Sequence, residues 1–302
     1  MTSYDEADRV IAAAEEDGFF DIVTSVDAYQ WARRSLGVEP TVSPSQEIEL
    51  FGQEAVVKQI TPFLNRDVQF PNTLILGEPG MGKTHLARWI AGERGESFEE
   101  LMAPVAPEDI PGFGIVLLDE VHRQTRPESL FPTMESDRVT ILGATTRPEK
   151  LEPAFASRFF LKLYLTRHSN EAMAEMAKWL LRDVTDETAE IFASASAGNP
   201  RQLERIAAVA AQIGVNDAEA VLSTVQITAD GLTDIHLRML RTLRKGNRPM
   251  GLSTLAVMLY LDEDTVKQHE RLLVEFDLVE LRPNGRLITK TGRQYLTVVE
   301  QG

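Results

Sequence analysis

The 302 residues (33.7 kDa) are 43% hydrophobic and 25% charged, a balance that argues against an intrinsically disordered chain. The absence of cysteine excludes disulfides and thiolate metal sites, and no apolar run is long enough to cross a membrane, so we expect a cytoplasmic protein. A net charge of −15 argues against indiscriminate binding to nucleic acids, although residues 232–302 carry 11 Lys and Arg against 9 Asp and Glu.

The first 45 residues predict a separate acidic element. They hold nine carboxylates against three arginines, and apolar side chains recur at helical spacing between Tyr4 and Ala14. Pro40 and Pro44 then interrupt regular structure. We therefore expect residues 1–45 to form an acidic helical N-terminal extension, which either covers the core of the next domain or binds a protein partner.

Residues 46–166 alternate between helical patterns and short apolar runs, which is typical of an α/β domain. Four runs bounded by turn residues predict strands: Thr73–Leu76, Ile115–Leu118, Val139–Leu142 and Leu161–Leu165. The first three are apolar enough to be buried on both faces. We therefore expect a parallel sheet between layers of helices.

The rest of the chain predicts two further domains. Residues 167–229 are almost entirely helical in pattern, as a small helical domain would be. Residues 230–302 give helices followed by a hairpin, with strands at Leu278–Leu281 and Arg286–Thr289. Helices followed by a hairpin favour a winged-helix domain that binds DNA.

Basic side chains of this last domain fall into two groups. One group is Arg238, Arg241, Arg244, Lys245 and Arg248, and the other is Arg282, Arg286, Lys290 and Arg293. An acidic protein with such a domain can hold a polyanion locally, or both groups can be solvated faces. The sequence leaves both interpretations open.

A phosphate-binding loop is the sharpest signal in the sequence. The run Gly77-Glu78-Pro79-Gly80-Met81-Gly82-Lys83-Thr84 matches G-x-x-x-x-G-K-[ST] at every fixed position, between a predicted strand and a helix that can start at His85. Its glycines let backbone N–H groups turn toward phosphates at the positive end of that helix. Lys83 can reach the β- and γ-phosphates and Thr84 can hold Mg²⁺, so we expect ATP and Mg²⁺ as cofactors. We expect the Met81 side chain to point outward.

Two carboxylates complete this predicted site. The strand Ile115–Leu118 delivers Asp119 and Glu120 to the edge of the sheet where ligands collect. Asp119 would organise Mg²⁺, and Glu120 would polarise the attacking water. Because Glu120 already fills that role, we interpret His122 as a local hydrogen-bonding residue.

Further polar residues fall in the order that an ATPase needs. Thr145 and Thr146 close the strand Val139–Leu142 with hydroxyls that can sense the γ-phosphate. Arg158 precedes the next strand, and Arg201 lies in the first turn of a helix. Taken singly, each arginine is more typical of a surface salt bridge.

Together these residues resemble the RuvB family, the Holliday-junction branch-migration motors of the AAA+ class. The matching segments, in family order over residues 46–300, include GEPGMGKTHLA (77–87), LLDEVHR (117–123), LGATTRP (142–148), GNPRQLERI (198–206) and LRPNGRLIT (281–289). The resemblance implies an AAA+ ATPase domain, a helical lid and a winged helix that grips branched or duplex DNA. It also implies a ring, hexameric in this family, with ATP bound between subunits.

The resemblance assigns roles to individual positions. The ATP site matches at Lys83, Thr84, Asp119 and Glu120 for the Walker motifs, Thr146 for the first sensor, Arg158 for the arginine finger and Arg201 for the second sensor. Arg286 matches a wing arginine that touches DNA, and Arg282 is a second candidate. In such motors the finger acts on the nucleotide of the neighbouring subunit, which couples hydrolysis to ring assembly.

The chain also departs from the family pattern. Only 27 positions separate Asp119 from Thr146, and the missing stretch corresponds to the hairpin by which RuvB docks on its partner RuvA. Docking on RuvA is therefore doubtful. The interval from Lys83 to Asp119 is also short, which predicts a reduced helix and pore-facing loop.

Two functions remain open at this point. The first is an ATP-hydrolysing, ring-forming DNA motor related to RuvB, which the presence of Glu120, Arg158 and Arg201 favours. The alternative is a nucleotide-switched DNA-binding adaptor or loader, which recruits a partner without translocating. The shortened ATPase domain favours this second function.

Overall fold

The structure, a computed structural model, describes residues 50–65 and 68–301. The N-terminal extension predicted for residues 1–45 lies outside these ranges. The chain divides after Thr166 into two compact units, each with hydrophobic cores of its own. None of the helices in the described ranges is long and apolar enough to cross a membrane.

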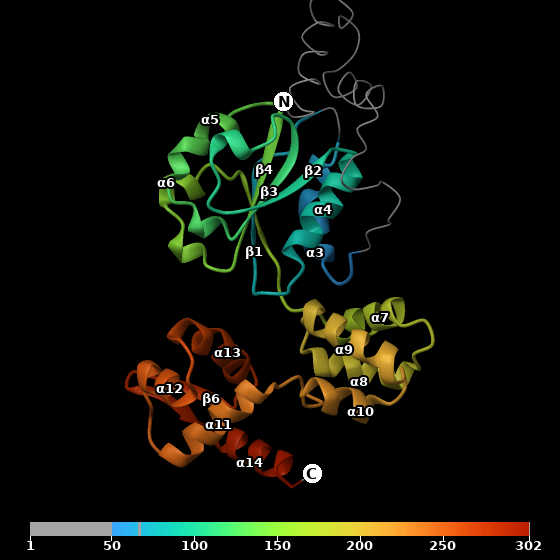
Figure 1. Cartoon of the computed structure of the whole chain (residues 1–302), viewed down its shortest axis with the longest axis vertical. Coiled ribbons are helices and arrows are strands. Elements are labelled where there is room, and N and C mark those ends of the chain that lie inside the picture. Colours follow the sequence, from blue (N-terminus) through green and yellow to red (C-terminus); the bar gives the residue numbers. More distant parts are fainter. Residues whose placement is uncertain (1–49, 66–67, 302) are drawn as a thin grey trace, which may run out of the picture. The chain divides into compact units, whose positions relative to one another are not determined.

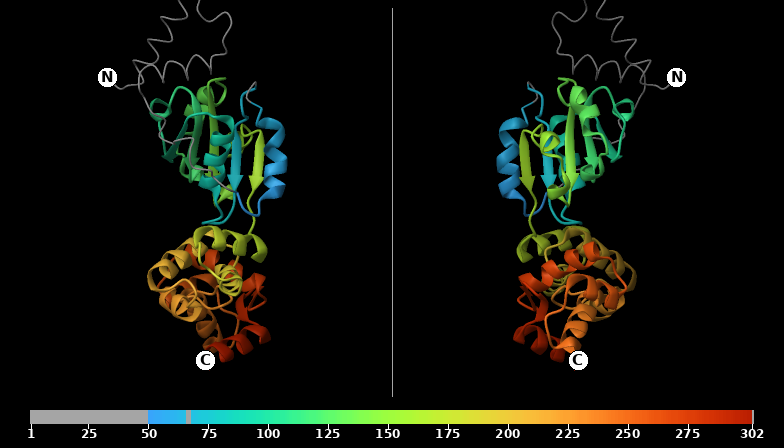
Figure 2. Two further views of the ribbon diagram at one scale, coloured as in Figure 1. Left: turned by 90° about the vertical axis from the view of Figure 1, so that its right-hand side faces the viewer. Right: turned by 90° about the vertical axis from the view of Figure 1, so that its left-hand side faces the viewer.

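A five-stranded parallel sheet forms the centre of the first unit, with the strand order β2-β3-β4-β1-β5 (Figure 1). Figure 2 shows that its strands run in one direction. The strands are β1 (Thr73–Leu76), β2 (Phe98–Met102), β3 (Gly114–Asp119), β4 (Val139–Thr145) and β5 (Leu161–Tyr164).

Helices cover both faces of this sheet because successive strand residues point to opposite sides. Ile75 and Leu117 pack in one buried cluster with α3 (Glu54–Ile60) and α4 (Lys83–Arg94). Their neighbours Leu74 and Leu118 pack in a second cluster with the short helices α5 (Phe131–Met134) and α6 (Pro153–Ala156). The predicted α/β class with a parallel sheet between helices is confirmed.

Four of the five strands agree with the sequence prediction. β1 has the predicted bounds, β5 is one residue shorter, and β3 and β4 extend further. The sequence analysis missed β2, whose segment FEELM contains Glu99 and Glu100. This strand lies at the edge of the sheet, where one face stays accessible to water, so it does not need a continuous apolar run.

Two connections in this unit are short. Between the parallel neighbours β2 and β3, the chain makes only the 3₁₀ turn η2 (Pro107–Asp109), where a helix usually lies. Between β3 and β4, residues 120–138 are all described and contain no strand; they form η3 (Val121–Arg123), η4 (Pro127–Leu130) and α5. These short connections agree with the reduced helix and the missing docking hairpin that the spacing predicts.

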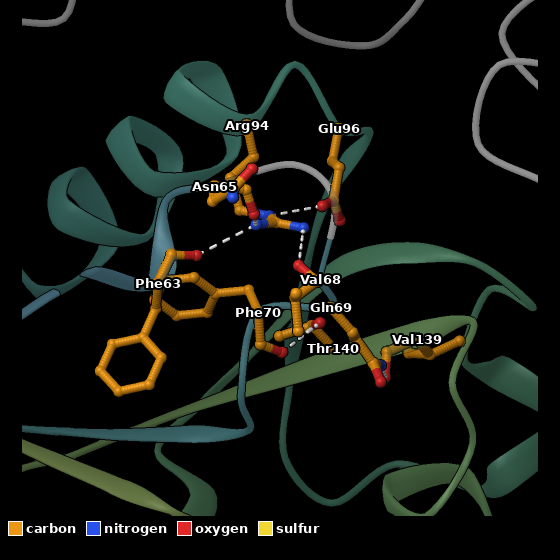
Figure 3. Close-up of polar contacts among 9 residues, drawn as sticks. All are labelled: Phe63, Asn65, Val68, Gln69, Phe70, Arg94, Glu96, Val139 and Thr140. Carbon is orange, nitrogen blue, oxygen red and sulfur yellow. Dashed lines mark hydrogen bonds and ion pairs between the residues drawn. The ribbon is translucent and has the colours of Figure 1, made fainter. Parts of the chain in front are cut away.

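A buried arginine lies at the amino edge of the sheet, where its strands begin (Figure 3). Arg94, at the end of α4, is 3% exposed and donates hydrogen bonds to the carbonyl oxygens of Phe63 (3.0 Å), Asn65 (2.5 Å) and Val68 (2.8 Å). Its Nε donates to Glu96 at 2.5 Å. A buried charge is tolerated only when it is paired and hydrogen-bonded, and Arg94 meets both conditions. These bonds fix the chain that leads into β1.

The same edge is closed by side chains that bond to backbone (Figure 3). Gln69 Nε2 donates to the carbonyl oxygen of Val139 at 2.9 Å, and Thr140 Oγ1 donates to that of Phe70 at 2.8 Å. The segment before β1 is thus tied to the start of β4. Both acceptors are main-chain carbonyl oxygens, so no sequence pattern reveals these two bonds.

The second unit begins with four helices: α7 (Asn170–Leu180), α8 (Asp186–Ser196), α9 (Pro200–Ile213) and α10 (Ala218–Val225). Each helix begins after a residue whose side-chain oxygen accepts a hydrogen bond from a backbone N–H of the first turn: Ser169, Thr185, Asn199 and Asp217 respectively. The four helices share one buried cluster around Phe192, Leu203 and Ile206. This agrees with the helical pattern of residues 167–229.

The unit continues as three helices, a hairpin and a last helix: α11 (Asp234–Gly246), α12 (Leu252–Leu259), α13 (Glu263–Glu275), β6 (Val279–Arg282), β7 (Gly285–Ile288) and α14 (Lys290–Val299). The predicted wing is present, with each strand shifted by one residue. Gly285 has a φ of 133°, and a Cβ there would lie 2.4 Å from the Met250 carbonyl oxygen, so only glycine fits.

Two histidines inside this winged helix lead to a prediction on pH. Thr233 N–H donates to His236 Nδ1 at 3.0 Å, so the His236 proton is on Nε2, which lies 3.1 Å from His269 Nδ1. Burial, and then the nearby charges of His269 and Arg167, lower the pKa of His236 from 6.5 to about 3. Below pH 6.5 the unfolded chain binds a proton that folded His236 excludes. The free energy of unfolding should therefore fall by up to about 1.4 kcal/mol per pH unit as the pH drops toward 3.

His236→Gln tests this prediction. Glutamine can still accept the Thr233 N–H from the third position of the helix, as in a capping box, but it does not titrate. Urea unfolding between pH 7 and pH 5 should show a shallower loss of stability in the variant than in the wild type. Equal slopes would show that His236 does not contribute.

Candidate nucleotide site and nucleic-acid interface

The candidate nucleotide site lies at the carboxyl edge of the sheet. β1 lies between β4 and β5, and the register pairs Leu76 with Thr145 and Leu118 with Gly143. Asp119 and Thr145 therefore end their strands beside the loop that starts at Gly77. Ligands bind at this edge in open parallel sheets.

Glycines shape the phosphate loop between β1 and α4. Gly80 and Gly82 have φ values of 83° and 86°, in the left-handed region that favours glycine. Gly82 precedes the first residue of α4, and no side chain caps this end of the helix. An uncapped helix N-terminus after a glycine loop is a binding site for phosphate.

Lys83 extends into this loop. Its Nζ donates to the carbonyl oxygens of Gly77 and Glu78, both at 3.0 Å, and the residue is 9% exposed. Thr84 follows in the first turn of α4 and is half-buried, and His85 is exposed. The ammonium, the hydroxyl and the helix end are donors and ligands of the kinds that fit a nucleotide with Mg²⁺.

Met81 corrects one expectation about the loop. Its side chain is 1% exposed and belongs to the core cluster that includes Ile75 and Leu86. The prediction that it points outward is wrong. The loop backbone curves around the phosphate site, which directs this side chain down into the sheet and α4.

Asp119 and Glu120 follow one another at the end of β3. Asp119 Oδ1 accepts a hydrogen bond from the Glu120 N–H at 2.9 Å. Glu120 has a φ of 50°, a conformation that is uncommon outside glycine and that clusters at functional sites. Its Oε2 is buried and accepts no hydrogen bond from the described residues. That oxygen is free to accept a proton from a water in the site.

His122 connects Glu120 to β4. Its Nδ1 lies 2.8 Å from Thr145 Oγ1, with which it shares a hydrogen bond, and 3.1 Å from Glu120 Oε2, with which it does not. Burial lowers the pKa of His122, more than the Glu120 charge raises it. The ring is therefore neutral at pH 7.

Thr145 precedes Thr146, the residue predicted to be the first sensor. It is fully buried, contacts His122 and accepts the Arg147 N–H at 3.0 Å. Thr146 follows the strand and is half-buried. Its sensor role stays a prediction. Thr145 is the last residue of the buried strand β4, whereas Thr146 lies after its end.

Arg158 follows α6, which lies with α5 on the face of the sheet opposite α4 (Figure 1). Its Nη1 pairs with Glu135, and its guanidinium lies over the Phe131 ring, 3.8 Å from the centroid. One third of the side chain is exposed. Within its own subunit, Arg158 is thus held on the face away from the α4 side, and its role as a finger stays a prediction.

The second unit holds the remaining predicted residues. Arg201 is exposed in the first turn of α9, after the Asn199 cap. Arg286, on β7, forms a bidentate pair with Glu270 of α13, at 2.6 and 2.9 Å. Arg282 is exposed on β6 and pairs with Glu280 at 2.8 Å. The sequence analysis did not foresee either carboxylate partner.

Comparisons with known proteins match both halves of this description. Residues 73–167 match the family model "ATPase family associated with various cellular activities (AAA)", and residues 229–297 match the "RuvB C-terminal winged helix domain". The chain is 29% identical to the Holliday junction branch migration complex subunit RuvB of Chloroflexus aurantiacus, over 86% of this chain and 89% of that protein. It is 26% identical to RuvB of Limosilactobacillus reuteri, over 86% and 92% respectively.

Solved structures give the same relationship. A mutant of Thermotoga maritima RuvB superposes with a TM-score of 0.75 at 26% identity, covering 86% of this chain and 99% of that one. The structure titled as the Thermotoga maritima RuvB Holliday junction branch migration motor has a TM-score of 0.72 at 27% identity, covering 82% and 95%.

Proposed function

Because this chain is a RuvB-like AAA+ ATPase with a C-terminal winged helix, we propose that it uses ATP and Mg²⁺ to drive movement on branched or duplex DNA. The observation that carries the proposal is the convergence of Lys83, Glu120 and Thr145 at one edge of the sheet, in a chain that also has a winged helix. Relatives named for Holliday junction branch migration support the DNA substrate.

Each residue of the site has a task in this proposal. Lys83 would exchange its two carbonyl partners for phosphate oxygens, and Thr84 and Asp119 would hold Mg²⁺, which when bound neutralises phosphate charge. Glu120 would orient the attacking water and accept its proton. His122 would position Glu120 through Thr145, and Thr146 would sense the terminal phosphate.

Two arginines would complete the site from elsewhere. Arg158 would act on the nucleotide of a neighbouring subunit, which suits its position after α6 and against Phe131 of α5. Arg201 would contact the nucleotide from the helical lid (residues 167–229). A ring, hexameric as the resemblance implies, would therefore be the active form. Docking on RuvA is not part of the proposal, since only helical turns lie between β3 and β4.

A nucleotide-switched adaptor is the second candidate. The short connections on either side of β3 favour it, because they reduce the surface of the ATPase unit that could act on DNA or a partner. Such a protein would bind ATP and DNA and recruit a partner, for example through residues 1–45, without moving along DNA.

Steady-state ATP hydrolysis separates the two candidates. We expect turnover that rises with protein concentration, because sites form between subunits, and that rises again with branched or linear duplex DNA. The chain should be assayed over a range of concentrations with each DNA and with none. ATP binding with negligible turnover under every condition would contradict the motor and leave the adaptor.

A further inference from the structure

The wing of this winged helix has little charge left for DNA. Arg286 shares both oxygens of Glu270, with side chains 17% and 8% exposed, and Arg282 is paired with Glu280. Each of the two arginines predicted to touch DNA thus has a carboxylate of its own. A phosphate would have to displace that carboxylate before it could bind.

The helix next to the wing is acidic. The segment from Asp262 through α13 carries five carboxylates against Lys267 and Arg271. Asp262, Glu263 and Asp264 stand together at its N-terminal end. This end would enter the groove between the two phosphate backbones if α13 served as a recognition helix in the usual way. Its charge repels a polyanion.

Positive charge exceeds negative charge where α11 and α14 lie side by side (Figure 1). We define the α11–α14 basic edge as one carboxylate, Glu300, and five cations that lie on these two helices or directly after α11: Arg241, Arg244, Lys245, Arg248 and Arg293. Arg241, Arg244 and Lys245 recur with spacings of three and one residues, which places them on one side of α11, and Arg248 follows two residues after the end of this helix.

The contacts within this edge leave positive charge exposed. Arg241 and Arg244 share the single carboxylate of Glu300, at 3.3 and 2.9 Å. Arg293 bonds to a neutral partner, Asn247 Oδ1, at 3.0 Å, which joins α14 to the end of α11. Lys245 and Arg248 are exposed and form no ion pair with any residue that the structure describes.

We propose that the α11–α14 basic edge, and not the wing, is the main surface by which this winged helix holds the phosphate backbone of DNA. The proposal rests on the proposed function, in that it assumes a DNA substrate. In this proposal, DNA phosphates bind the cations of the edge, whose positive charge exceeds the single negative charge of Glu300. Glu300 neutralises part of that positive charge, because it forms ion pairs with Arg241 and Arg244.

Salt dependence of DNA binding tests the proposal. The full chain, with ATP and Mg²⁺ held constant, is titrated onto a labelled duplex at several KCl concentrations, and fluorescence anisotropy gives the slope of log K against log[salt]. Removing one phosphate contact should reduce the slope by about one. The double variant Lys245→Gln/Arg248→Gln should therefore bind more weakly, with a slope smaller by about two. Glu300→Gln should change both quantities in the opposite direction.

Two control variants separate the outcomes. Arg182→Gln removes an exposed cation from the loop between α7 and α8 and should leave the slope unchanged, and Arg282→Gln reports on the wing. A slope reduced by Arg282→Gln but not by the double variant would overturn the proposal. An equal reduction in Arg182→Gln would also overturn it, because only net charge would matter. A wild-type chain that binds no DNA would overturn the proposed function itself, and this surface with it.

Discussion

Replacing Arg158 by alanine is expected to lower the ATP turnover of the assembled chain by about 10³- to 10⁵-fold, the usual effect of losing an arginine finger. Arg158 would stabilise charge on the nucleotide of the next subunit, from a surface where Phe131 and Glu135 now hold it. Steady-state hydrolysis at saturating protein measures the loss. Arg158→Lys should restore little, because lysine keeps the charge without the planar fork.

A mixing experiment shows whether Arg158 acts between subunits. Lys83→Ala would lack its own nucleotide site but keep Arg158, and Arg158→Ala would keep a site but lack the arginine. Each variant alone should be inactive, and a mixture should recover turnover where one supplies the site and the other the arginine. A mixture as inactive as its components would contradict action in trans. Arg182→Ala, another exposed arginine, should leave turnover unchanged.

Glu120→Gln is expected to lower ATP turnover by about 10²- to 10⁴-fold, the range for losing a general base, while leaving ATP binding intact. Glutamine keeps the shape of the side chain beside His122 but cannot accept the proton of the attacking water. Single-turnover hydrolysis and equilibrium binding of a labelled ATP give the two quantities.

The exposed carboxylate Glu128, nearby on η4, provides the matched control. Glu128→Gln should hydrolyse ATP at the wild-type rate. Equal turnover in Glu120→Gln and the wild type would remove Glu120 from the proposed chemistry. His122→Ala should reduce turnover less than Glu120→Gln does, because His122 acts only by positioning Glu120.

Much of the fold follows from local sequence patterns. The runs at β1, β3 and β4 are recognisable because strands buried on both faces must be apolar. β5 lies at an edge and is recognisable instead from the alternation of Leu161 and Leu163 with polar or exposed residues. The hairpin is recognisable from Pro283-Asn284-Gly285, and the structure shows why Gly285 is needed. β2 escapes the same reasoning, because an edge strand with Glu99 and Glu100 does not differ in pattern from a loop.

The site was predictable in part, for a related reason. The phosphate loop and Asp119-Glu120 are contiguous motifs, so the sequence identifies them. The contact of His122 with Thr145, 23 positions along the chain, depends on the alignment of β3 and β4. The Glu270 partner of Arg286 depends likewise on how α13 packs against the hairpin. Such pairs join distant segments, and no spacing rule reveals them.

The burial of Met81 ties nucleotide affinity to the stability of the first unit. A loop whose middle side chain fills the hydrophobic core cannot change shape without opening a cavity beneath it. Its phosphate-binding conformation is therefore maintained by the same contacts that keep the unit folded, and little conformational entropy remains to be lost when a ligand arrives. By linkage, a ligand that binds only the folded unit raises its resistance to unfolding. Substitutions far from the phosphates that loosen this core would then weaken the site without touching it.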